Sequence, residues 1–228
     1  MMGKSKLTKY DKAFLWKLMA ISGVCWTVAE ILMIKIGFQE SVTTVPFIAL
    51  CAGFAWKIHF TFYKPQQMPQ WIINIVWLGL ELVLIYQFLT FSSDIWIGAL
   101  IPGMGQMMIH LCLFAITSGI CFLLISAMSQ EFEDTEKGAY SAFSINLLMS
   151  VLFINLLLTR GSVAGQSIYI LGFMMLGTLI PAYCFYRGYP KSKFLNTLYL
   201  TTFLVDIIYA TLLIKMHMIQ GINPFLRF

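Results

Sequence analysis

The sequence predicts an all-α integral membrane protein built as a bundle of seven transmembrane helices. Its 228 residues are 59% hydrophobic and 11% charged, more apolar side chain than a soluble domain of this size can bury. The apolar runs are each close to the ~20 residues that a helix needs to cross hydrocarbon, whereas a membrane β-barrel would show short alternating segments. We expect one domain over residues 1–228. Its predicted spans are about 14–36, 44–63, 71–91, 107–128, 140–159, 166–186 and 194–215.

The distribution of basic residues predicts a cytoplasmic N-terminus and a C-terminus on the opposite side of the membrane. The predicted cytoplasmic side carries Lys4, Lys6, Lys9, Lys12, Lys17, Lys64, Lys137, Arg187, Lys191 and Lys193, and the opposite side carries Lys35, Arg160, Lys215 and Arg227. This bias accounts for the net charge of +5. We expect no nucleic-acid partner, because no basic patch with interleaved aromatic residues is present. The membrane is either a bacterial inner membrane or the endoplasmic reticulum, and the oligomeric state stays open.

The first two spans each carry a charge that is costly in hydrocarbon. Glu30 lies in the outer half of the first span, which is too long for a removable signal peptide and has Trp26 one turn earlier. Glu30 either bonds a neighbouring helix as a neutral acid or faces a cavity. Lys57, next to Trp56 in the second span, either extends to the cytoplasmic interface or neutralises a buried acid.

The third span has one polar face that we expect to point inward. Asn74, Trp77 and Glu81 recur at steps of three and four residues, which places them on the same side of a helix. The fifth and sixth spans are joined by the tightest connection in the chain, which opens at Arg160 and contains two glycines for unusual backbone angles. By its position alone Arg160 is structural. Pro181 breaks the sixth span near its cytoplasmic end.

The seventh span holds a carboxylate near the centre of the bilayer. Asp206 has roughly ten apolar or weakly polar residues on either side. An acid at that depth usually faces a cavity or a partner. Tyr199, Thr202, Asp206 and Tyr209 follow steps of three and four residues, so acid, phenol and hydroxyl groups share one face. Such a face suits proton transfer.

The cysteines indicate neither a disulfide nor a metal site. All five lie within predicted spans, and none has the spacing of metal ligands. Buried free cysteine mostly behaves as a small apolar residue. We therefore expect no metal and no cofactor.

Several short pieces of the chain carry a resemblance to a known family. The chain resembles the fungal membrane-bound meroterpenoid cyclases of the paxilline and pyripyropene type, with their bacterial relatives, through nearly all seven spans. The matching pieces are Leu32-Met33-Ile34-Lys35, Leu50-Cys51, Ala55-Trp56, Met149-Ser150, Arg160-Gly161-Ser162 with Gly165 and Ser167, and Asp206 with Tyr209. The Arg-Gly-Ser connection together with the last-span Asp-x-x-Tyr is the most specific part.

The resemblance implies a reaction. Such cyclases protonate an epoxide or an alkene of a polyprenyl chain, and the resulting cation closes rings without a metal. The expected partner is therefore a lipophilic prenylated small molecule that enters from the bilayer. The resemblance implies Asp206 as the proton donor and offers a second acid at or near Glu81, whereas Glu30 has no counterpart in the family. We expect Glu81 or Glu30 to tune Asp206 or to replace an acid that the family has and this chain lacks. Candidate substrate contacts are Lys57, Trp26, Trp56, Trp77, Asn74, Tyr209 and Arg160.

One position departs from the family pattern. Where the family has Ala-Trp-Glu in the second span, this chain has Ala55-Trp56-Lys57. A lysine cannot act as a carboxylic acid, and a cation beside Asp206 would favour its ionised form. Two alternatives follow. The first is a divergent enzyme that uses a Lys57–acid pair for isomerisation or for binding an anionic head group. The second is a carrier or binding protein for a small lipophilic molecule, in which the buried charges form neutral pairs. The absence of a convincing internal repeat argues against a transporter.

Overall fold

The computed structural model describes residues 9–92, 105–132 and 138–227, and the regular secondary structure in this part of the chain is all helical. Lys4, Lys6 and Lys137, on which the predicted orientation partly depends, lie outside it. The helices are α1 (Lys9–Glu40), α2 (Phe47–Ile58), the π-helical turn η1 (His59–Tyr63), α3 (Gln70–Phe91), α5 (Gln106–Glu131), α6 (Ala139–Arg160), α7 (Ile168–Gly188), α8 (Lys193–Ile219) and the 3₁₀ turn η2 (Pro224–Leu226). The predicted all-α class is confirmed.

Within the described residues, six helices are long and apolar enough to cross a membrane: α1, α3, α5, α6, α7 and α8. The remaining predicted span corresponds to Phe47–Tyr63, an apolar segment made of α2 and η1 that is shorter than the others. Its length is at the lower limit of about 17 residues for a spanning helix. The count of seven spans and the orientation of the termini therefore remain predictions.

The described helices group into two compact units. The first contains Met1–Leu32 and Ala142–Phe228, and the second contains Met33–Ser141. Helix α1 begins in the first unit and ends in the second. The expectation of one domain stays a prediction.

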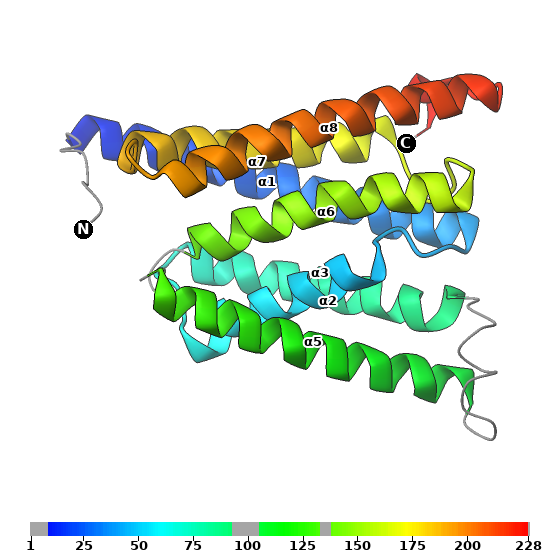
Figure 1. The fold of residues 1–228 in the computed structure, drawn as a ribbon, viewed down its shortest axis with the longest axis horizontal. Coiled ribbons are helices and arrows are strands. Elements are labelled where there is room, and N and C mark those ends of the chain that lie inside the picture. The colour runs from blue at the N-terminus through cyan, green and yellow to red at the C-terminus, as the bar shows by residue number, and fades with distance from the viewer. Residues whose placement is uncertain (1–8, 93–104, 133–137, 228) are drawn as a thin grey trace. The chain divides into compact units, whose positions relative to one another are not determined.

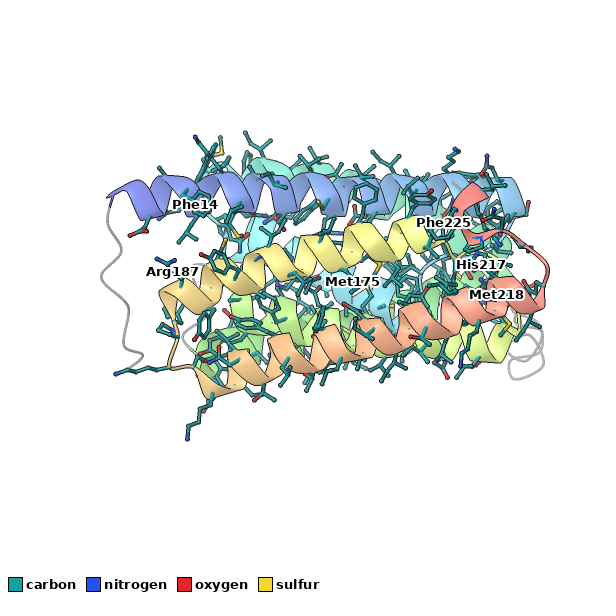
Figure 2. All side chains as sticks on the ribbon, turned by 90° about the horizontal axis from the view of Figure 1, so that it is seen from above. Phe14, Met175, Arg187, His217, Met218 and Phe225 are labelled. Carbon is teal, nitrogen blue, oxygen red and sulfur yellow. The ribbon has the colours of Figure 1, made fainter. Side chains whose placement is uncertain are left out.

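In the first unit, α7 and α8 pack side by side (Figure 1). Helix α6 joins them through edge-to-face packing of Phe143 on Tyr199, with ring centroids 4.5 Å apart. Figure 2 shows Phe14 of α1 and Arg187 of α7 at one end of this unit, with His217 and Phe225 at the other. Arg187 pairs there with Asp11 of α1 at 3.5 Å.

Pro181 lies inside α7 and does not break it, so the expected break is wrong. Proline has no N–H, so the carbonyl four residues earlier, that of Gly177, loses its helical donor. The Ser22 hydroxyl of α1 supplies that donor at 2.7 Å. The glycine at 177 lets the Trp26 ring of α1 lie close to α7, since a Cβ there would be 2.7 Å from that ring. A neighbouring helix thus satisfies the backbone group that proline leaves free, as transmembrane helices commonly require.

In the second unit, α2 packs against both α3 and α5 (Figure 1). The ring of Phe47 stacks on Phe88 of α3, with centroids 5.0 Å apart. Phe54 packs on Phe114 of α5, with centroids 5.3 Å apart. These aromatic contacts hold α2 between its neighbours and bring its polar residues next to α3.

Candidate functional site

Asp206 lies on α8 with its side chain buried against α6. Its Oδ1 atom is 2.6 Å from Ser150 Oγ. The same Ser150 Oγ is 3.0 Å from the carbonyl oxygen of Asn146, one turn earlier on α6. Ser150 therefore touches two acceptors with a single hydroxyl proton. The sequence placed Ser150 among the pieces of the family resemblance but did not identify it as the partner of Asp206.

Tyr209 extends the same face of α8 by one turn. Its ring packs on Phe153 of α6 with centroids 5.8 Å apart, and its phenol donates to Gln166 Oε1 at 2.8 Å. Thr202 and Asp206 are also buried, so these three residues of α8 form one buried face, as their spacing predicted. Sequence reasoning missed Gln166, whose only signal was a polar side chain in a tight connection.

Arg160 ends α6 and stabilises the connection that carries Gln166. Its Nη1 donates to the carbonyl oxygen of Ala164 at 2.5 Å. Gly161 and Gly165 have φ values of 62° and 74°, which only glycine adopts readily. Arg160 thus positions the loop behind the Tyr209–Gln166 hydrogen bond.

Lys57 and Glu81 form a buried ion pair between α2 and α3 in the second unit. Lys57 is 7% exposed, so it does not extend to the interface, and its ammonium instead neutralises a buried acid. A Cβ at Gly53 would lie 3.1 Å from Glu81 Oε1, so the glycine leaves room for this carboxylate. The pair neutralises two charges that would each be costly alone.

Asn74 and Trp77 lie on the Glu81 side of α3. Asn74 is fully buried and donates to Gln66 Oε1 at 2.9 Å and to the carbonyl oxygen of Phe60 at 3.4 Å. Trp77 is half-buried. Asn74 therefore links α3 to the π-helical turn η1 through the Phe60 carbonyl oxygen. Turns of this kind are often found at functional sites.

The other predicted site residues are divided between the two units. Glu30 is buried on α1 in the first unit, where Trp26 lies against Gly177. Trp56, in the second unit, donates from Nε1 to Ser141 Oγ at 3.1 Å. Among the residues that the structure describes, no group of three or more His, Cys, Asp or Glu side chains has the arrangement of a metal site.

Comparison with known proteins assigns the chain to a family over nearly its whole length. A family model for Pyr4-like transmembrane terpene cyclases matches residues 8–219. The chain is 27% identical over 215 residues to the terpene cyclase macJ of Penicillium terrestre, covering 88% of this chain and 81% of that protein. It is 25% identical over 190 residues to the Pyr4-family terpene cyclase mfmH of Annulohypoxylon moriforme, covering 82% of this chain and 77% of that protein.

A third relative is more similar over a shorter stretch. The terpene cyclase paxB of Penicillium paxilli is 29% identical over 147 residues, covering 64% of this chain and 58% of that protein. No solved structure matches the chain. The family and the six long apolar helices together indicate a multi-pass membrane protein.

Proposed function

Because the chain belongs to the Pyr4-like transmembrane terpene cyclase family, we propose that it is a membrane-embedded cyclase that starts ring closure by protonating a prenylated lipophilic substrate. Asp206 is the proposed proton donor. Its O–H bond breaks and the proton goes to an epoxide oxygen or an alkene carbon of the substrate. The carbon cation that results is attacked by alkene π electrons, and loss of a proton at the end gives a cyclic isomer of unchanged mass.

The hydrogen bonds around Ser150 are the observation that carries this proposal. With a single proton, the Ser150 hydroxyl makes one full hydrogen bond, either to Asp206 Oδ1 or to the Asn146 carbonyl oxygen. If Asp206 is a carboxylic acid, its O–H donates to Ser150 Oγ and the Ser150 O–H donates to the Asn146 carbonyl oxygen, so that each of the two contacts is a full hydrogen bond. A neutral acid also avoids the cost of an ionised one in hydrocarbon. A protonated carboxyl group of this kind is suited to general acid catalysis.

The Lys57–Glu81 pair supports assigning the acid role to Asp206. Glu81 is occupied as the ion-pair partner of Lys57, whereas Asp206 has a serine hydroxyl as its partner. Glu81 is therefore proposed to balance the charge of Lys57, where the family has a glutamate. Glu30 is buried on α1 and is proposed as the acid that tunes the reaction instead.

The same pair favours a second candidate function. Buried charges that form neutral pairs are what a binding protein or carrier for a small lipophilic molecule would have, and a Lys57–Glu81 pair could also bind an anionic head group. In that case the relationship to named terpene cyclases reflects a shared fold with changed chemistry. The two functions differ in whether a new product forms.

A product assay tests the proposal. Membranes that contain the chain are given epoxidised and plain polyprenyl compounds, and extracts are examined by mass spectrometry for cyclic isomers of unchanged mass. We expect Asp206→Asn to lower product formation by about 100-fold or more, since it removes the general acid. Ser150→Ala should lower it by roughly tenfold through loss of one hydrogen bond to the acid.

Asp11→Asn is the matched control, because it makes the same change at a half-exposed position paired with Arg187. It should leave the product yield unchanged. If folded wild-type protein gives no isomer from any compound, the cyclase proposal is wrong and the binding protein is favoured. If Asp206→Asn retains the full yield, another group supplies the proton.

A further inference from the structure

Gln166 is a fully buried amide in the connection between α6 and α7. Its Oε1 accepts the Tyr209 phenol at 2.8 Å, whereas Nε2 has no hydrogen-bond partner within residues 9–92, 105–132 and 138–227. If the amide is turned over, Nε2 donates to the phenol oxygen and Oε1 is left over instead. In either orientation one end of a buried amide is unused. Leaving such a group unsatisfied costs stability.

The backbone around Gln166 leaves little freedom for the side chain to find a partner by moving. The Gln166 N–H donates to the carbonyl oxygen of Val163 at 3.0 Å. Gln220, just after α8, donates to the carbonyl oxygen of Gly161 at 3.2 Å and accepts from the Val163 N–H at 3.3 Å. The loop is therefore tied to the end of the helix that carries Asp206 and Tyr209.

Thr202 is a second buried polar group without a partner on the same face. It lies one turn before Asp206 and is 1% exposed, and its hydroxyl has no hydrogen-bond partner in the described part of the chain. Other threonines of α8 behave differently: Thr197, Thr201 and Thr211 each donate to the carbonyl oxygen four residues earlier. Unused polar groups therefore flank Asp206 on both sides, through Thr202 and through the Tyr209–Gln166 pair.

We propose that Gln166 is a substrate-binding residue, whose Nε2 donates a hydrogen bond to an oxygen atom of the substrate and holds it beside Asp206 and Tyr209. This inference rests on the proposed function for the class of substrate. An oxygen has lone pairs that accept an amide N–H, while a hydrocarbon end would leave the amide unsatisfied. Gln166 therefore selects an oxygen-bearing end of a prenylated lipophile over its plain hydrocarbon counterpart.

The test is a binding measurement that needs no turnover. The full chain in detergent is titrated with two probes, a terminally epoxidised polyprenyl compound and its parent alkene. We expect the wild type to bind the epoxide about five- to tenfold more tightly, as one hydrogen bond provides. Gln166→Met should bring the ratio of the two dissociation constants close to one. The dissociation constant of the alkene should stay unchanged.

Two further variants make the result decisive. Gln87→Met is the matched control, since Gln87 is an equally buried glutamine on α3, and it should keep the wild-type ratio. The double variant Gln166→Met with Tyr209→Phe removes both partners of one hydrogen bond, which protects folding if the single change does not, and it should also lose the ratio. The proposal is wrong if the wild type shows no preference, or if both compounds weaken equally in the variants.

The binding test and the product assay fail independently. An epoxide preference that depends on Gln166, without any cyclic product, would retain the binding role and remove the cyclase. If cyclic products form but the ratio of dissociation constants is unchanged in Gln166→Met, the proposed cyclase function holds and the proposed role of Gln166 is wrong.

Discussion

At the scale of single residues, Lys57, Glu81 and Asp206 are buried ionisable groups that each have a side-chain partner. Lys57 occupies a position where the family resemblance led us to expect an acid, and its ammonium is compensated by Glu81 of α3. Asp206 is held by a hydroxyl that accepts from a neutral acid as readily as it donates to a charged one. Glu81 and Asp206 are buried to a similar degree but have different proposed roles. Glu81 is a member of an ion pair, and Asp206 is the candidate acid.

The Lys57–Glu81 pair gives a prediction about stability. Lys57→Met leaves Glu81 as a buried uncompensated carboxylate, so unfolding in detergent should become easier by about 3–5 kcal/mol. Lys57→Met combined with Glu81→Leu removes both charges and should recover most of that loss. Equal destabilisation by the single and double variants would show that the two side chains contribute independently rather than as a pair.

At the scale of the helix, α7 illustrates how one element completes another. The proline at 181 removes a backbone donor from α7, and Ser22 of α1 replaces it at the Gly177 carbonyl. The absence of a side chain at Gly177 lets Trp26 approach the same site. The sequence-based prediction that proline breaks the helix therefore fails, because the replacement donor comes from a residue far away in the sequence.

The Ser22–Gly177 hydrogen bond predicts a specific coupling. Ser22→Ala should destabilise the protein by about 1 kcal/mol, because the Gly177 carbonyl loses its donor. In a Pro181→Ala background the same change should have almost no effect, because the N–H of the new alanine can bond Gly177 within the helix. Unfolding midpoints of the four proteins in detergent measure the coupling, with Thr201→Val as an exposed control. Identical effects of Ser22→Ala in both backgrounds would disprove it.

At the scale of the whole molecule, the number of spans determines on which side of the membrane the C-terminus lies. In the part of the chain that the structure describes, six helices are long enough to cross, and the segment made of α2 and η1 is shorter. An odd number of crossings puts the termini on opposite sides of the membrane, and an even number puts them on the same side. The short segment thus determines the topology, and it also carries Lys57.

Labelling of the two termini tests this topology. Single reporter cysteines in tags at each end, in a chain otherwise free of accessible thiols, are treated with a membrane-impermeant reagent in intact cells and in opened membranes. Seven spans predict that only the C-terminal tag is labelled in intact cells. Matching behaviour of both tags would show that the segment 47–63 does not cross.

The sequence by itself determined the class of the protein, the helices and two of the buried faces. Composition requires lipid contact, and the period of about 3.6 residues places Asp206 beside Tyr209 and Asn74 beside Glu81. These properties depend on residues near one another along the chain. The family resemblance, carried by short pieces spread over the spans, is likewise a property of the sequence, and the family match confirms it.

Only the tertiary structure decided which groups are partners. Lys57 and Glu81 are 24 residues apart, Gln166 and Tyr209 are 43 apart, and Ser150 and Asp206 are 56 apart. The sequence left Lys57 with two possible surroundings, and it assigned no substrate role to Gln166. The physical reason is that a helical period specifies the face on which a side chain lies, whereas its hydrogen bonds depend on which helix packs against that face.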